Sequence, residues 1–438
     1  MKKWLTGISL AAVSSMIVIS GCGNPANNAS PSPSTPAASA AATAAPKSAE
    51  PVTITLNGWG SSPEETALFQ QVLKDFQAKH PNITVKFDVI ADQYMDVIKT
   101  RLVGGEGADV FFLDAFEAPG LIAKNVLEPL DGYVKPEFDV ADFEAPLLNA
   151  FKGKDGKSYG FPKDTSTLAL FYNKKDFAEA GITKVPTTWE ELQDAAKKLT
   201  KADGGKVSRF GFGAAPELAR QMFMIQAAGG KVSDDNGNAA YSSPEALKGL
   251  QPVVDMHLKD KSAGEPKDLG AGWGGEMFGQ HKASMVIEGN WAIPYLQSTF
   301  KDLDFATAEL PTTFGKKATM AYTVAYVMNK SSKHKQEAYE LISYLTGKEG
   351  MKTWTSKGLA LPARKSVAKE LGFDKDPLRA ALVAGNSYSI PWQAKETLPI
   401  IMNNFNNQFI SAYQGKVTLE EALKKAQDTA NKEIAASK

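Results

Sequence analysis

Apolar residues recur with two different spacings in the first part of the globular chain, one typical of strands and one typical of helices. Residues 52–56 and 82–89 alternate apolar and polar positions, which predicts two half-buried strands. A helix is predicted from residue 63, because apolar side chains recur there at helical spacing, at Leu68, Phe69, Val72, Leu73 and Phe76. A second helix is predicted over 93–102, and the stretch ADVFFLD at 108–114 is typical of a buried strand. This β-α-β-α-β order predicts an α/β fold with a mostly parallel sheet.

The stretch MVIEGNWA, residues 285–292, shows how such a strand is predicted to end. Residues 285–287 form a short apolar run, and Glu288, Gly289 and Asn290 have turn chemistry. Trp291 therefore lies just past the predicted strand end, where open α/β sheets place ligand sites. A Trp at this point can equally cap a hydrophobic core, so both interpretations stay open on this stretch alone.

The first fifty residues predict where the protein works. Lys2 and Lys3 precede an uncharged, mostly apolar stretch, which predicts a secretory signal over residues 1–21. The residues ISGC at 19–22 resemble the lipobox of bacterial lipoproteins, which implies a lipid on Cys22. Cys22 is the only cysteine, so it cannot form a disulfide within the chain. Residues 22–50 are rich in Pro, Ala, Ser and Thr and predict a disordered tether to the membrane.

The remaining chain, residues 51–438, is too long for one ordinary core and predicts two domains. Further helix starts are predicted at 187–190, 242–245 and 418–421, without any fixed-period repeat. The 49 basic and 49 acidic residues balance, and loss of the signal leaves a net charge of about −2. Nucleic acid is therefore not expected as a partner.

No catalytic motif stands out. The four His residues are widely spaced, and we find no nucleophile elbow or phosphate-binding loop. We expect no cofactor and no metal. A glycosidase needs only two carboxylates, however, so a secreted carbohydrate-active enzyme stays open as the competing hypothesis.

Aromatic placement points to a ligand. Four Trp residues stand in Gly, Pro or turn contexts: Trp59, Trp273, Trp291 and Trp392. By contrast, Trp189 and Trp354 lie in helical patterns and are expected in the core. Indoles at strand ends suit ligands with apolar faces and hydroxyl edges, as sugars have. Nearby polar residues could bind hydroxyl groups, although a turn or capping role fits each equally: Ser61, Asp114, Asp164, Ser166 and Asn290.

Longer stretches carry a resemblance to a known family. They include GEGADVFFLDAF, YGFPKDTSTLALFYNKKDF, KASMVIEGNWA and YLTGKEGMKTWTSKGLALPARKS. From about residue 52 to the C-terminus, their order and spacing resemble solute-binding lipoproteins of ABC importers, in the maltose-binding-protein-like family of carbohydrate receptors. In relatives, the Trp of the NW turn stacks on a sugar ring, which carries over to Trp291. The loop after the first strand, with Trp59, is implied to contact sugar. Ser166 replaces an acidic residue of the maltose receptor, which puts maltose itself in doubt.

The resemblance implies a two-lobe, periplasmic-binding-protein-like fold with a ligand cleft between lobes joined by hinge crossings. The crossings are expected near 161–162, 322–325, where Tyr322 would contact ligand, and 376–377. Lobe 1 would comprise residues 51–162 and 325–375, and lobe 2 residues 163–324 and 376–438.

The implied function is that of a receptor rather than an enzyme. It would be a monomer, lipid-anchored at the extracytoplasmic face of a bacterial membrane. It would bind an oligosaccharide and deliver it to ABC permease subunits, or serve a chemosensor.

Overall fold

The computed structural model describes residues 50–60 and 63–437. The predicted signal, Cys22, most of the tether and Ser61 lie outside the described residues. Lobe 1 contains three parallel strands, β1 (Val52–Gly58), β2 (Ile83–Val89) and β3 (Val110–Asp114). Its helices are α1 (Pro63–Lys79), α2 (Tyr94–Val103), α3 (Ala118–Ala123), α4 (Ala145–Asn149), α11 (Lys335–Thr346), α12 (Lys348–Thr355) and α13 (Lys365–Glu370).

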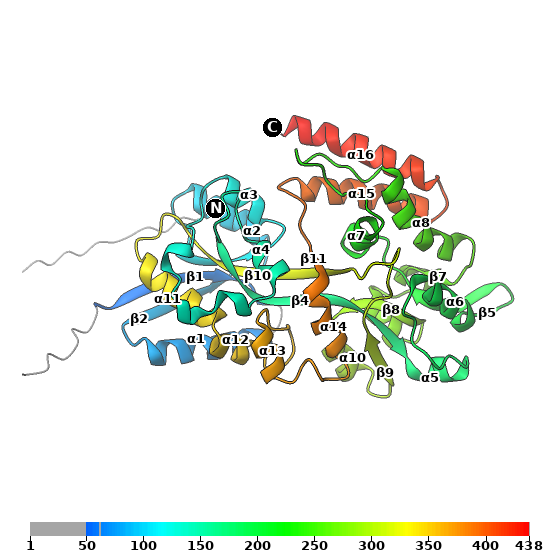
Figure 1. Ribbon diagram of the computed structural model, residues 1–438, viewed down its shortest axis with the longest axis horizontal. Coiled ribbons are helices and arrows are strands. Elements are labelled where there is room, and N and C mark those ends of the chain that lie inside the picture. The colour runs from blue at the N-terminus through cyan, green and yellow to red at the C-terminus, as the bar shows by residue number, and fades with distance from the viewer. Residues whose placement is uncertain (1–49, 61–62, 438) are drawn as a thin grey trace, which may run out of the picture. The chain divides into compact units, whose positions relative to one another are not determined.

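Lobe 2 is built on the parallel pair β6 (Lys206–Gly213) and β8 (Ala283–Gly289). Three short strands extend it, β5 (Lys201–Asp203), β7 (Ala263–Gly264) and β9 (Phe305–Ala308). Its helices are α5 (Lys174–Glu179), α6 (Trp189–Leu199), α7 (Leu218–Ala227), α8 (Pro244–Leu258), α9 (Gly274–Gly279), α10 (Ala292–Thr299), α14 (Ala380–Gly385), α15 (Leu398–Tyr413) and α16 (Leu419–Ala436). Figure 1 shows α15 and α16 packed side by side on lobe 2.

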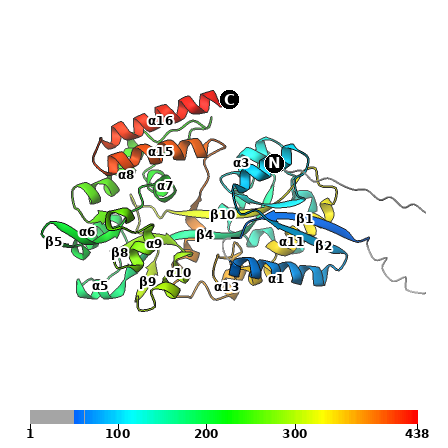
Figure 2. The same cartoon turned by 180° about the vertical axis from the view of Figure 1, so that it is seen from behind.

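Two long strands join the lobes. β4 (Gly160–Asn173) and β10 (Thr319–Met328) pair antiparallel and run side by side through the middle of the described chain (Figures 1 and 2). The described strands form one sheet of eleven, with β2-β1-β3-β10-β4-β8-β6-β5 as its main path. Because β4 and β10 are shared, the sheet is continuous between the lobes.

The buried side chains of these strands belong to different cores at their two ends. Phe161 and Tyr326 pack in the lobe 1 core with α1, α11 and α12. Leu168 and Met320 pack in the lobe 2 core with α6, α7, α8, α15 and α16. Each strand therefore crosses from lobe to lobe within a few residues.

A third connection follows α13. Val367 packs in the lobe 1 core, Leu371 packs against both this core and a second core of lobe 2, and Phe373 belongs to the second core. It then passes α14 and β11 (Ser389–Pro391), which pairs with β10, before it reaches α15. The predicted two-lobe α/β fold is thus confirmed, while the predicted division between the lobes stays a prediction.

The hydrophobic pattern predicted the early elements correctly, and the β-α-β-α-β order from β1 to β3 is confirmed. The later helix starts are confirmed too, with Thr188, Ser243 and Thr418 as hydrogen-bonding N-caps of α6, α8 and α16. Trp189 and Trp354 are buried, as expected.

The prediction of a turn at residue 288 was wrong. Strand β8 continues to Gly289, and Glu288 is only 2% exposed. A carboxylate is stable in such a position only when it has partners. Arg220, which is distant in sequence, is one of them.

Candidate functional site

Several predicted site residues lie where parallel strands end. In lobe 1, Trp59 follows β1 and Asp114 ends β3, while in lobe 2 Trp291 comes two residues after β8. The carboxyl ends of parallel strands are where open α/β sheets bind ligands. The strand arrangement therefore provides one candidate surface on each lobe.

Trp291 forms the centre of the lobe 2 surface. Its ring lies so close to Gly289 that a Cβ there would be 2.2 Å from the indole. The indole Nε1 donates to Glu288 Oε2 at 3.0 Å, and the ring meets Tyr322 edge-on at a centroid distance of 5.7 Å. Two of the predicted residues, Trp291 and Tyr322, are thus in contact. We call this group, together with Arg220 and Glu288, the Trp291 wall.

Arg220 and Glu288 are the members of the wall that sequence reasoning missed. Arg220 Nη1 donates to Tyr322 Oη at 3.1 Å, and Nη2 to Glu288 Oε2 at 3.3 Å. The guanidinium carbon lies 5.3 Å from the Trp291 ring centroid, within cation–π range. Tyr322 in turn donates to the backbone oxygen of Ala219. Each polar side chain of the wall is therefore held by another.

Burial affects the charges in the wall. It raises the pKa of Glu288 above its ordinary value, although the charge of Arg220 and the hydrogen bond from Trp291 lower it. Burial also raises the pKa of Tyr322 to about 12, so its hydroxyl keeps its proton near neutral pH. The wall thus combines fixed hydrogen-bonding groups with an aromatic ring in a low-dielectric setting.

Trp273 lies beside this wall without joining it. Its ring packs on Tyr295 at a centroid distance of 5.0 Å. The next residue, Gly274, approaches Glu288 so closely that a Cβ would be 2.5 Å from Oε1. The glycine-rich stretch here thus allows the start of α9 to cover Glu288, and a ligand contact by Trp273 stays a prediction.

On the lobe 1 side, two predicted carboxylates flank one residue of β10. Asp114 and Asp164 are both paired with Val324, from β3 and from β4. Asp164 is buried and already has partners. Lys163 Nζ lies 2.5 Å from Asp164 Oδ2, and Trp354 Nε1 donates to the same oxygen at 2.9 Å. The Asp114 side chain, in contrast, has no protein partner within the described chain.

The surroundings of Asp114 disfavour its charge. Burial, with the charges of Asp164 and Glu117, raises the pKa of Asp114 from 3.8 to about 7, while Lys163 acts in the opposite direction. An unpartnered carboxyl at a strand end can accept hydrogen bonds from a ligand. Asp114 is therefore the free polar group of this surface.

Trp59 and Ser166 lie near the crossing strands. The half-buried Trp59 ring meets Tyr94 and Phe112 edge-on, at centroid distances of 4.8 and 5.2 Å. Ser166 is paired with Tyr322 across β4 and β10. Ser166 therefore lies on β4 two residues after Asp164 and opposite Tyr322 of the Trp291 wall. Ligand contacts of Trp59 and Ser166 stay predictions.

Asn290 and Trp392 are tied to neighbouring backbone. Asn290 is fully buried, and its Nδ2 donates to the backbone oxygen of Leu359 at 3.0 Å. The half-buried Trp392 packs on the lobe 2 core, and its backbone N–H donates to Ala321 oxygen at 2.8 Å. These contacts are structural, and ligand roles for both residues stay predictions.

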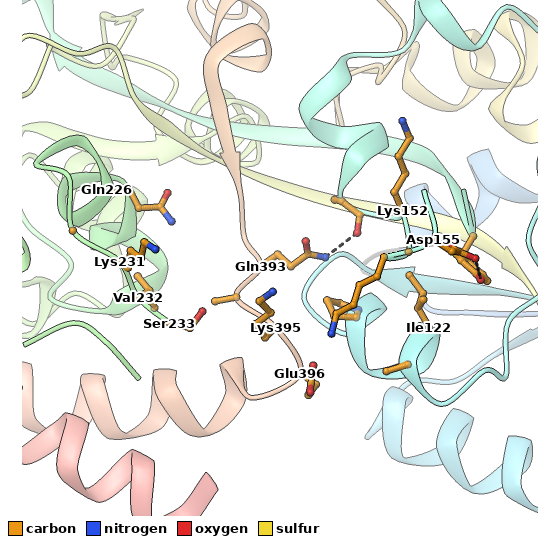
Figure 3. A pocket seen from close by; sticks show the side chains of 18 residues that line it. Ile122, Lys152, Asp155, Gln226, Lys231, Val232, Ser233, Gln393, Lys395 and Glu396 are labelled. Atoms are coloured by element: carbon orange, nitrogen blue, oxygen red, sulfur yellow. Dashed lines mark hydrogen bonds between the residues drawn. The ribbon is translucent and has the colours of Figure 1, made fainter. Parts of the chain in front are cut away.

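A large cavity lies between the lobes at a different place. It measures about 860 Å³ and contains none of the predicted site residues. Its labelled lining residues in Figure 3 are Ile122, Lys152, Asp155, Gln226, Lys231, Val232, Ser233, Gln393, Lys395 and Glu396. Gln393 Nε2 donates to the backbone oxygens of Ala115 and Ala150, which ties this segment to lobe 1.

The cavity and the Trp291 wall do not compete as sites. A stacking site needs no enclosed volume in the ligand-free protein, because its second wall can arrive when the lobes close. The Trp291 wall is therefore a candidate ligand-contacting surface although it does not line this cavity.

The sequence matches the model of the family described as bacterial extracellular solute-binding protein over residues 59–352, more than half of the chain. The chain belongs to this family. A protein of Brucella abortus (strain 2308), named only as a binding protein, is 29% identical over 312 residues, covering 69% of this chain and 74% of the relative. The galactooligosaccharide-binding protein of Bacillus subtilis (strain 168) is 25% identical over 379 residues, covering 82% and 85%.

A solved structure supports the same architecture. The cyclo/maltodextrin-binding protein complexed with maltotetraose superposes with a TM-score of 0.77 at 23% identity, covering 89% of this chain and 98% of that one. The relatives named here are thus binding proteins rather than enzymes. In residues 50–60 and 63–437, no helix has the length and apolar character needed to cross a bilayer.

The raised pKa of Asp114 generates a prediction about pH. Between pH about 4 and about 7 the folded protein holds a proton on Asp114 that the unfolded chain has released, so stability falls as pH rises through this window. We expect Asp114→Asn to flatten the fall in a series of thermal unfolding midpoints. Glu179→Gln, at an exposed carboxylate, should leave it unchanged. An Asp114→Asn profile as steep as that of the parent would contradict the assignment.

Proposed function

We propose that the protein is an extracytoplasmic receptor that binds an oligosaccharide between its lobes and delivers it to an ABC permease. The observation that carries this proposal is the Trp291 wall at the carboxyl end of β8. An indole face suits the C–H face of a pyranose, and the surrounding charged and hydroxyl groups suit its hydroxyl edge. The galactooligosaccharide and maltotetraose in the names of similar proteins support a sugar as the ligand class.

Closure of the lobes provides the signal in this proposal. A sugar that stacks on Trp291 and reaches Asp114 would contact both lobes at once. Such a ligand binds the closed arrangement better than the open one, so it shifts the population toward closure. Hinge closure around a ligand is general among periplasmic binding proteins. The permease would then recognise the closed form.

The glycosidase hypothesis is less well supported. The pair Asp114 and Asp164 offers two neighbouring carboxylates, as such enzymes require. Asp164 Oδ2 is nevertheless held by both Lys163 and Trp354, which fixes this carboxylate within the protein. The binding-protein relatives also favour a receptor.

The Trp291 wall generates the central binding prediction. A stacked indole face contributes about 1 to 3 kcal/mol, so Trp291→Ala should weaken sugar binding about ten- to a hundredfold. The measurement is calorimetry against a panel of mono- to pentasaccharides. Tyr172→Ala is the matched control, because it truncates a half-buried lobe 2 aromatic that packs on Phe177 instead.

Two results would overturn this assignment. Normal sugar binding by Trp291→Ala, together with a much lower unfolding temperature, would make Trp291 a core residue. Release of new reducing ends from a sugar during long incubation, abolished by Asp114→Asn, would instead support the enzyme hypothesis.

Membrane attachment through Cys22 is a further part of the proposal. It rests on the ISGC stretch and the polar segment that follows. We expect Cys22→Ser to abolish lipid attachment and to move the protein into the medium or a wash fraction. Ser30→Ala, in the tether, should stay attached. A Cys22→Ser protein that remains with membranes in high salt would show that the anchor is elsewhere.

A further inference from the structure

A small cavity lies in lobe 2 next to the Trp291 wall. It measures about 10 Å³ and lies between the start of α6, the first turn of α7 and the ends of β6 and β8. Trp189, Arg220 and Gln221 line it together with apolar groups such as Phe212 and Ile287. Arg220 thus faces the cavity and also takes part in the wall.

Each of the three polar lining residues has a buried atom without a protein partner. These atoms are Trp189 Nε1, Arg220 Nε and Gln221 Oε1. Nine such side-chain atoms occur among the described residues, so a third of them belong to this one cavity. Buried polar groups without partners are costly, and their gathering at one place indicates a shared partner.

The chemistry of the three atoms identifies that partner. Trp189 Nε1–H and Arg220 Nε–H are donors, while Gln221 Oε1 is an acceptor. The Gln221 amide is oriented by its own Nε2, which donates to the backbone oxygen of Ala215 at 3.0 Å. A water molecule can accept two hydrogen bonds and donate the third. The volume suits one water molecule, and buried waters typically make about three hydrogen bonds.

We propose that one structural water molecule binds Trp189 Nε1, Arg220 Nε and Gln221 Oε1. It fixes the inner edge of the Arg220 guanidinium, whose outer nitrogens contact Tyr322 and Glu288. Trp189 is then a positioning residue that acts on the wall through water and Arg220. The positioning role of Trp189 in sugar binding rests on the proposed function, whereas the water site itself does not.

A purely structural Trp189 is the alternative. The residue is 3% exposed, and its ring packs edge-on against Phe212 at a centroid distance of 6.0 Å. A role in packing alone predicts a loss of stability on substitution. It predicts no effect on the Trp291 indole N–H, because the Trp189 ring packs on Phe212 rather than on Trp291. The Arg220 Nε–H lies at the same cavity, so it responds to loss of the indole ring in either case.

The test uses water as the probe and needs no sugar. In the ¹⁵N-labelled full chain, magnetisation transfer from water to the Trp189 indole proton and the Arg220 Nε proton is measured by NMR. Trp189→Phe and Arg220→Lys assign the two signals. We expect both protons to contact a slowly exchanging water, and Gln221→Met to abolish that contact. Absence of any such water contact in the parent overturns the proposal.

A second comparison separates positioning from packing. Trp189→Phe replaces the indole by a smaller phenyl ring without the donor, so it should shift the Arg220 Nε–H and Trp291 indole N–H resonances. Ile287→Val changes the apolar lining of the same cavity and should leave both in place. An unshifted Trp291 indole N–H resonance in Trp189→Phe, or an equal shift of it in both variants, refutes a positioning role.

The effect on binding follows once the calorimetric panel has identified a sugar. Trp189→Phe removes one hydrogen bond to the water molecule that contacts Arg220 Nε. The affinity for that sugar should therefore fall about three- to tenfold. Ile287→Val should bind as the parent does. If no sugar binds at all, the proposed function fails while the NMR measurement still decides the water site.

Discussion

The antiparallel pairing of β4 with β10 is the constraint on which the two-lobe arrangement depends. The pairing runs from Ala321 opposite Thr167 to Val327 opposite Gly160, and both strands contribute side chains to both lobes. Backbone ladder hydrogen bonds at this place cannot be lost without exposing buried polar groups. The lobes can therefore move relative to each other only by changes that keep this ladder, such as twisting and bending of the two strands.

One irregularity in the ladder places the lobe 1 polar groups. Val324 is paired with Asp164 and Ala325 with Pro162, so Lys163 is an extra residue in β4, as in a β-bulge. Trp354 holds the bulged residue and the one after it, because Lys163 Nζ lies 3.8 Å from its ring centroid and Asp164 accepts its indole proton. Asp114, on β3 at the other side of β10, is left as the free carboxyl. The bulge thus separates a structural carboxylate from one that is available to a ligand.

Local patterns predicted much of the fold and only part of the site. The alternating strands and the N-caps Thr188, Ser243 and Thr418 depend on neighbours in sequence, so they could be predicted. Glu288 could not, because a Glu before Gly-Asn has the composition of a turn, and only its pairing with Arg220, 68 residues away, explains its burial. Asp164 was predicted as a ligand contact, which stays a prediction, and its partner Trp354 comes from the distant helix α12. No sequence pattern signalled the 10 Å³ cavity, which forms only when α6 and α7 meet two strands.

The central claim is that a sugar contacts the Trp291 wall on lobe 2 and Asp114 on lobe 1 at once, and so closes the two lobes that β4 and β10 connect. Small-angle scattering of the protein with and without the tightest-binding sugar of the panel tests it most directly. We predict a smaller radius of gyration at saturating sugar, and less compaction for Trp291→Ala at the same sugar concentration. Saturated binding with an unchanged radius of gyration would contradict closure and the account of the site that depends on it.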